Sequence, residues 1–500
     1  MSNFCTAVKA AVAAAALLLG GSALAGGTAL AGGTALASAK DLSGPALSVE
    51  DAVGGLVSDA LTANLELDAA EGGVAQRLAA LDQARALYLP SLDFSARYTA
   101  ANGGRTIDFP VGDLLNPVYA TLNQITGSSR FPAVQNQEVN FQRTREQDTA
   151  VSLTQPLYDP RISSGRMAAQ SQYEAAAAAR IALAARIERD MRAAYYRWLQ
   201  ARAQIGIFDA TLELATENRR VNESLFRNGK ITRDLVFRAE ADQLEVQQSQ
   251  LGAQNAEQLA HSYVNLIRNA PFDRALPSVV VDDPDIDRLR NELAAHTAQP
   301  TLTLAPLQDA AVQQRYELRQ LDAISAAAAA GEKLARAAFK PRLAFAFDVG
   351  TQGETYAFTQ EDRYLLASVV LKFNFFAGGG DEAGIASARA VERQARANRS
   401  LQEQQIRFQV QQALQDLEFT EASLGTAAKR VEAAAGAFRI ASRKRDLGQI
   451  NQAEFIDSRR AMTDAQLNLN VTRFAALGSL AELEYALGAD SHHVPPEGQP

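Results

Sequence analysis

The fold of this chain is decided by a stretch that occurs twice, first as Phe226-Arg-Asn-Gly-Lys-Ile-Thr-Arg-Asp234. It returns in outline as Arg445-Asp-Leu-Gly-Gln-Ile-Asn-Gln-Ala453, and each copy separates two long helical patterns. Two earlier landmarks are also paired, in the same order. Leu153-Thr-Gln-Pro-Leu-Tyr158 corresponds to Leu371-Lys-Phe-Asn-Phe-Phe376, and Tyr88-Leu-Pro-Ser-Leu92 corresponds to Phe339-Lys-Pro-Arg-Leu343. These pairs predict an internal two-fold repeat of strand, strand, long helix, turn and helix.

Each Gly turn joins two long runs of helix-forming sequence. The runs cover residues 161–227 and 232–269 around the first turn, and 382–446 and 452–487 around the second. The first run predicts a helix on the order of 100 Å long, which globular domains rarely contain. Its apolar residues are spaced alternately four and three apart, which predicts left-handed supercoiling with Trp198 as a packing residue. This seam consists of Ile187, Met191, Ala194, Trp198, Ala201, Ile205, Phe208 and Leu212.

Four short segments alternate apolar and polar residues, which is the pattern of β-strands with one apolar face. Residues 91–100 and 147–156 form the first pair, and residues 342–350 and 364–376 form the second. Prolines and glycines are frequent in residues 101–146, which we interpret as a long polar loop between the first two strands. Each pair therefore predicts a hairpin inserted between helical segments.

The predicted domain organisation follows from these elements. The first repeat covers residues 40–270 and the second covers residues 306–488, with an irregular linker at 271–305. Each repeat begins with a further helical pattern, at 47–89 and at 307–339. An acidic cluster in the linker is interpreted as solvated, because it lacks the glycine and the distal glutamate of a calcium loop.

Both ends of the chain lie outside the repeats. Residues 1–39 combine a basic residue, a short apolar run and several Ala-x-Ala sites, which indicates a signal peptide cleaved between Ala25 and Lys40. An N-terminal membrane anchor is the alternative interpretation. The single cysteine, Cys5, precedes the apolar run and is lost on cleavage. Residues 489–500 are predicted to be disordered.

Composition narrows the class of function. The formal net charge is −8 and no basic stripe is visible, which argues against nucleic acid as a partner. No segment after the signal peptide offers the roughly 20 uncharged apolar residues that a membrane helix needs. An exported chain can instead span an outer membrane with strands that close into a barrel.

The strands and helices together predict an oligomer. Four strands are too few to close a barrel, for which about eight are needed. Three copies sharing one barrel supply twelve strands and leave no open edge. The fold class that we predict is therefore mainly α with a membrane part. It is a homotrimeric 12-stranded β-barrel continuous with a long periplasmic α-helical barrel.

The order, duplication and spacing of these motifs resemble the TolC family of outer-membrane efflux proteins. The resemblance rests on the segment ending at Tyr158, on residues 88–92 and on the Gly-x-Ile turns at Gly229 and Gly448, and it covers about residues 45–488. It implies a homotrimeric channel-tunnel in the outer membrane that docks to a periplasmic adaptor and an inner-membrane transporter. The chain has no lipobox cysteine, which sets it apart from the lipoprotein branch of the family.

The resemblance places the two Gly turns at the periplasmic tips, where family members meet the adaptor. We expect an exposed isoleucine beside each glycine, because a small apolar knob suits a groove between partner helices. A purely structural interpretation stays open, since glycine between helices permits the turn itself. The expected docking surface consists of Asn228, Gly229, Lys230 and Ile231 at the first tip, and Leu447, Gly448, Gln449 and Ile450 at the second.

Acidic residues follow only the second turn. Glu454 and Asp457 are three residues apart and share a helix face. By position they match the acidic residues that ring the entrance in TolC-like proteins, and a trimer would bring together six carboxylates that attract cations. The alternative is an ordinary solvated face, with these acids paired to Arg459 or Arg460.

Three further charged residues lie near the tips, namely Asp234, Arg445 and Asp446. A gate latch is one hypothesis for them, in which salt links between neighbouring helices hold the mouth shut until an adaptor docks. Exposed charges usually contribute little to stability, and that alternative stays open.

No catalytic constellation, metal site or cofactor motif is recognisable in the sequence. The expected function is that of a passive duct in a tripartite efflux or type I secretion system, and not that of an enzyme. A periplasmic coiled-coil structural protein or a trimeric adhesin is the competing hypothesis. The amphipathic strands between helices argue against it. The cargo and the class of inner-membrane partner are left open.

Overall fold

The structure of the chain is a computed structural model whose described residues belong to one compact unit. The predicted signal peptide, 1–39, and the predicted disordered tail, 489–500, lie outside the described residues. The described residues are 48–281, 283–296, 303–355 and 359–488.

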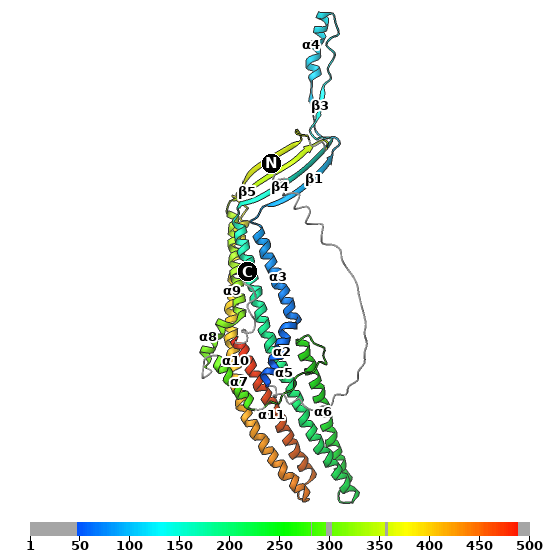
Figure 1. The fold of residues 1–500 in the computed structure, drawn as a ribbon, viewed down its shortest axis with the longest axis vertical. Coiled ribbons are helices and arrows are strands. Elements are labelled where there is room, and N and C mark those ends of the chain that lie inside the picture. Colours follow the sequence, from blue (N-terminus) through cyan, green and yellow to red (C-terminus); the bar gives the residue numbers. More distant parts are fainter. Residues whose placement is uncertain (1–47, 282, 297–302, 356–358, 489–500) are drawn as a thin grey trace, which may run out of the picture. The chain divides into compact units, whose positions relative to one another are not determined.

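A four-stranded antiparallel sheet combines the strands of both repeats in the order β1-β4-β5-β6 (Figure 1). The two predicted hairpins are joined by pairing of β4 with β5, in which Val151 faces Val349 and Leu153 faces Phe347. The last strand ends before Phe373, earlier than the sequence pattern predicted. The strands are β1 (Ser91–Ala100), β4 (Arg145–Tyr158), β5 (Arg342–Gly353) and β6 (Arg363–Lys372).

Two helical hairpins carry the predicted Gly turns. The first helix of each is close to 70 residues long, with 68 residues in α5 and 67 in α10, or about 100 Å at the usual rise. The hairpins pack on each other through α5 and α11. Their helices are α5 (Pro160–Arg227) with α6 (Arg233–Ile267), and α10 (Gly380–Asp446) with α11 (Gln452–Leu487).

The helix that begins each repeat is broken at one residue. The sequence predicted continuous helices, but Asn64 and Arg315 both adopt extended conformations. Asn64 caps the following helix and donates to the carbonyl of Ile267, at the end of α6, at 2.7 Å. The resulting helices are α2 (Val49–Ala63) and α3 (Leu65–Ala86) in the first repeat, and α8 (Leu304–Gln314), α9 (Tyr316–Arg336) and the short 3-10 helix η1 (Ala337–Phe339) in the second.

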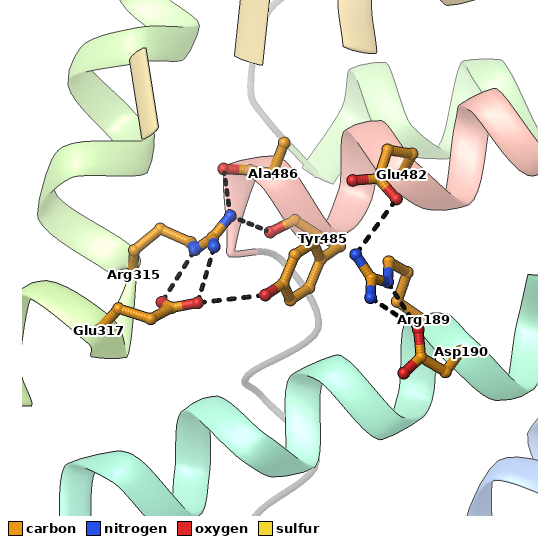
Figure 2. Close-up of polar contacts among 7 residues, drawn as sticks. All are labelled: Arg189, Asp190, Arg315, Glu317, Glu482, Tyr485 and Ala486. Atoms are coloured by element: carbon orange, nitrogen blue, oxygen red, sulfur yellow. Dashed lines mark hydrogen bonds and ion pairs between the residues drawn. The ribbon is translucent and has the colours of Figure 1, made fainter. Parts of the chain in front are cut away.

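In the second repeat the break residue is Arg315, whose side chain also reaches the end of the last helix (Figure 2). Its guanidinium donates to the carbonyls of Tyr485 and Ala486, at the end of α11, at 3.1 and 3.3 Å. It also forms a two-bond ion pair with Glu317 at 2.9 and 2.7 Å. The break residue of each repeat therefore holds the C-terminal carbonyls of the last helix of that repeat.

The ring of Tyr485 lies between two guanidinium groups in the same cluster. Arg315 is 4.3 Å and Arg189 of α5 is 4.6 Å from the ring centroid, and both arrangements are cation–π contacts. Burial favours the neutral form of Glu317, but the hydrogen bonds and charge of Arg315 outweigh it and lower the pKa of that carboxyl. We call Arg189, Arg315, Glu317 and Tyr485 the equatorial clasp.

The main apolar core lies beside this clasp. Trp198 is only 1% exposed and its indole donates to Glu257 at 2.6 Å, so its predicted packing role is confirmed. The Tyr195 hydroxyl donates to the carbonyl of Pro277 at 2.8 Å. That contact ties the core to the segment predicted as an irregular linker. The linker also contains a helix, α7 (Asp283–His296), that the sequence prediction missed.

The connection predicted as a polar loop, residues 101–146, contains regular structure. A short antiparallel ribbon extends from the sheet, and a helix of 16 residues lies between its strands (Figure 1). The prolines explain the wrong prediction, since Pro110 precedes the helix and Pro117 lies inside it. These elements are β2 (Thr106–Phe109), α4 (Val111–Thr126) and β3 (Gln137–Asn140). None of the helices in the described ranges has the length and apolarity needed to cross a membrane.

Candidate functional site

Both predicted turns close with the same backbone geometry. Gly229 and Gly448 have φ angles of 70° and 68°, in the left-handed region that glycine adopts without steric cost. The amide of Lys230 donates to the carbonyl of Leu225 at 2.9 Å, and the amide of Gln449 makes the equivalent bond at 2.8 Å. This is a Schellman motif. Helix termination therefore accounts for the glycine in both repeats.

Most of the predicted docking residues are accessible at these turns. Ile231 and Ile450 are half-buried, so the prediction of an exposed isoleucine beside each glycine is wrong. The exposed apolar side chain of the second tip is instead Leu447, which is 70% exposed. The exposed members of the set are Asn228, Gly229, Lys230, Leu447, Gly448 and Gln449.

The two acidic residues after the second turn are exposed. Asn451 caps α11 by accepting a hydrogen bond from the amide of Glu454 at 2.8 Å, which fixes the first turn of that helix. Asp457 lies one turn further along on the same face. In the part of the chain that the structure describes, neither carboxylate forms an ion pair.

The two arginines that offered an alternative role for these acids are engaged elsewhere. Arg459 donates to Asp242 of α6 at 2.7 Å. Arg460 donates to Glu245 of α6 at 2.5 Å and lies 3.5 Å from Asp242. The alternative in which Glu454 and Asp457 pair with these arginines is therefore not what the chain forms.

The predicted latch residues bond to side chains of their own hairpins, and the charge of Arg445 also acts on Glu217 of α5. Asp234 accepts a hydrogen bond from Thr232, two residues away. Arg445 pairs with its neighbour Asp446 at 3.0 Å and lies 4.3 Å from the ring centroid of Phe455. Among the described residues, the structure does not bring Asp234 and Arg445 together. A latch between copies of the chain stays a prediction.

A buried polar layer, which the sequence pattern did not predict, lies between the hairpins. Asp242 and Arg459 have side chains only 2% and 3% exposed, and their ion pair joins α6 to α11. Nearby, the hydroxyls of Thr211 and Thr463 lie 3.1 Å apart and join α5 to α11. We call these four residues the polar seam. The sequence shows a charged residue in each helix but gives no signal that the two meet.

The polar seam replaces the predicted apolar one toward the turns. The seam residues from Ile187 to Ala201 are buried as predicted, whereas Ile205, Phe208 and Leu212 are half-buried. The buried positions beyond them are shifted along the helix, with a four-three-four spacing. They are Thr211, Ala215, Asn218 and Asn222.

Comparison with known proteins identifies this architecture. A model of the family described as "Outer membrane efflux protein" matches residues 56–268 and 307–489, most of the chain. The chain belongs to this family. The family match has two parts, which agrees with the internal repeat. No curated protein matches the sequence.

Solved structures of other channels share the fold of this outer membrane efflux protein. The Campylobacter jejuni CmeC outer membrane channel has a TM-score of 0.72 at 13% identity, covering 93% of this chain and 94% of its own. The outer membrane protein VceC of Vibrio cholerae scores 0.70 at 17% identity, covering 87% and 96%. The open state of the Neisseria gonorrhoeae MtrE channel scores 0.68 at 18% identity, covering 87% and 89%.

These findings settle the class of function and the location. The protein is an outer-membrane efflux channel of the TolC-like type, located in the outer membrane and extending into the periplasm. Its family is one of transport ducts and not of enzymes. The competing hypothesis of a coiled-coil structural protein or an adhesin is not favoured.

Proposed function

We propose that three copies of this efflux protein share one 12-stranded barrel and one helical tube. The observation that carries the proposal is the state of the sheet edges. Within the described sheet, β1 pairs only with β4 and β6 pairs only with β5. Open edges with apolar faces are a liability that closure removes. Phe94 on β1 and Val369 on β6 are among the exposed apolar residues that a lipid-facing wall would use.

The helices support the same assembly. Phe237, Leu244 and Leu251 of α6 are exposed and recur every seven residues, which is the repeat of a helix that packs on another helix. A groove between α10 and α11 is lined by Phe419 and Val471, which are also exposed. Neighbouring copies would cover both surfaces in a closed tube.

The oligomeric state tests this proposal directly. The protein is purified in detergent, and its mass is measured by native mass spectrometry together with its heat-dependent mobility in gels. The expected mass is that of three copies, with dissociation on heating. A monomer that retains its strand content would overturn the shared barrel.

We further propose that the turns at Gly229 and Gly448 dock to a periplasmic adaptor that links the duct to an inner-membrane transporter. The matching Schellman geometry presents two equivalent tips, and Leu447 offers an exposed apolar anchor at the second. Apolar anchors of this kind are common in docking of helical partners. The proposed surface keeps the full predicted set, including Ile231 and Ile450 at the base of each tip.

Site-specific crosslinking in cells tests the docking surface. A photoreactive residue at Leu447 is compared with one at Ile440, which is also exposed but lies two helical turns from the tip. Crosslinking of another envelope protein from position 447 but not from position 440 is expected. Equal yields at both positions would contradict a tip-specific surface.

We also propose that Glu454 and Asp457 form the acidic ring of the entrance. Their support is that both carboxylates are exposed while Arg459 and Arg460 bind α6. The double variant Glu454→Gln with Asp457→Asn should reduce selectivity for K⁺ over Cl⁻, measured by reversal potentials in planar bilayers. Asp446→Asn is the matched control, because that carboxylate is already paired with Arg445. Unchanged selectivity in the double variant would contradict the proposed acidic ring.

A further inference from the structure

The insertion between β1 and β4 contains a helix face that nothing in the described chain covers. Helix α4 exposes Leu114, Val118 and Ile125, which are 70%, 52% and 76% exposed. With the exposed Thr121 they are spaced four, three and four residues apart. That spacing forms a straight stripe along the helix and is the seam of a coiled coil. We call these four residues the α4 stripe.

The opposite face of α4 is fixed, so the stripe has a defined direction. Asn116 donates to the carbonyl of Val134 at 2.9 Å and accepts from its amide at 2.8 Å. Asn123 makes the same pair of bonds with Phe131, at 2.8 and 3.1 Å. Gly112 is also pressed against this segment, since a Cβ there would lie 2.3 Å from the carbonyl oxygen of Val134. The stripe therefore points away from a rigid support.

Charge indicates what covers the stripe. Asp113 is the single charged residue between Val111 and Thr126, and its carboxylate accepts a hydrogen bond from Asn136 at 3.0 Å. Identical helices can therefore approach each other without like-charge repulsion. A helix that lies on a lipid surface instead has a polar face rich in Lys and Arg, and α4 has neither.

The position of the insertion points to the same occupant. It leaves the sheet from β1, which is an edge strand. In the assembly under "Proposed function", on which this inference rests, that edge meets the next copy. A seam of two heptads is weak by itself, but helices attached to one assembly have a high effective concentration.

We propose that α4 is a contact between copies of this chain. The stripe Leu114, Val118, Thr121 and Ile125 packs on the same stripe of the other two copies, as a short three-helix bundle beyond the barrel. Apolar residues at these positions bury against each other.

Disulfide formation in cells tests the bundle. A single cysteine replaces Val118 in a Cys5→Ser background, which has no other cysteine. The control replaces Ala120, which is exposed but more than a quarter of a turn around the helix from every residue of the stripe. Mild oxidation should give a disulfide-linked dimer with Val118→Cys and at least five-fold less with Ala120→Cys.

The possible results of this experiment test the α4 contact separately from the trimer. Native mass spectrometry reports the number of copies in each variant without oxidation. Three copies without a Val118→Cys disulfide would overturn the α4 contact and leave the shared barrel standing. Equal disulfide yields from both positions would also overturn it, since a mobile helix has no preferred face. A monomer in every variant would overturn the proposed assembly.

Discussion

The equatorial clasp and the polar seam both place buried charges between helices, but they satisfy those charges differently. Arg315 is matched by two bonds to Glu317 and two helix-terminal carbonyls. In the polar seam, one oxygen of Asp242 and the Nε of Arg459 are buried without a hydrogen-bond partner. A fully bonded buried charge rigidifies its surroundings. In a pair with unbonded polar atoms, the remaining bonds do not fully offset the free energy of desolvation. We infer that the hairpins are held more firmly at the clasp than near their turns.

The largest expected effect follows from removing Arg315. The variant Arg315→Ala leaves the half-buried Glu317 without its cation. It also removes the side-chain donor to the carbonyls of Tyr485 and Ala486, of which that of Tyr485 keeps a bond from the amide of Gly488. We expect a loss of about 3–5 kcal/mol in unfolding free energy, seen as a lower midpoint in thermal unfolding followed by circular dichroism. Arg319→Ala is the control, because Arg319 is exposed and should change stability by about 0.5 kcal/mol or less. Similar midpoints for both variants would contradict the clasp.

In the polar seam, replacement of one member of the ion pair should destabilise the protein, whereas replacement of both members should be tolerated. Asp242→Ala strands the buried Arg459 and should cost about 3 kcal/mol by the same measurement. The double variant Asp242→Leu with Arg459→Met removes both charges and should be neutral or stabilising by about 1–4 kcal/mol. Glu245→Ala is the control, because its ion pair with Arg460 is exposed and such pairs contribute about 0–1 kcal/mol.

The same paired replacement at the clasp should have a different result. Arg315→Met with Glu317→Leu also removes both charges, but it takes away the side-chain donor to the carbonyls of Tyr485 and Ala486. It should therefore stay destabilised relative to wild type. Equal behaviour of the two double variants would mean that the regions do not differ as inferred.

A smaller effect is expected at the matching break in the first repeat. Asn64 caps α3 and holds the carbonyl of Ile267, but it carries no charge. Asn64→Ala should cost about 1–2 kcal/mol, as for other N-caps. The midpoint of thermal unfolding should then fall less than in Arg315→Ala. A larger fall would mean that the first repeat depends more on its break residue than the second.

The smallest effect is a dependence on pH below neutrality. The pKa of Glu317 is lowered in the fold, so its contribution is fully present above the unfolded value of about 4.3. It is lost as the pH falls through the lower folded pKa. Thermal midpoints measured from pH 7 downward should drop below about pH 4.3, and Glu317→Gln should weaken that dependence. Identical pH profiles would show that Glu317 does not contribute.

The repeat, the strands and the long helices could be predicted from the sequence, because these depend on local patterns. Periodicity places α5 and α10 within two residues of their observed starts, and Gly229 and Gly448 mark turns by backbone conformation alone. Helix α4 was missed because its prolines suggested a loop. Asn64 is a residue type that caps helices, but its bond to the distant carbonyl of Ile267, and the bonds of Arg315 to the end of α11, have no local signal.

The pairing of polar residues between helices could not be predicted from the sequence, because it depends on how the helices pack. Asp242 and Arg459 lie in different repeats, and the pattern of either helix gives no sign of the other. The same holds for Arg315 and the end of α11, and for the α4 stripe, whose exposure depends on which face Asn116 and Asn123 fix. Hydrogen bonds and ion pairs depend on distances of about 3 Å, which folding sets and local sequence does not.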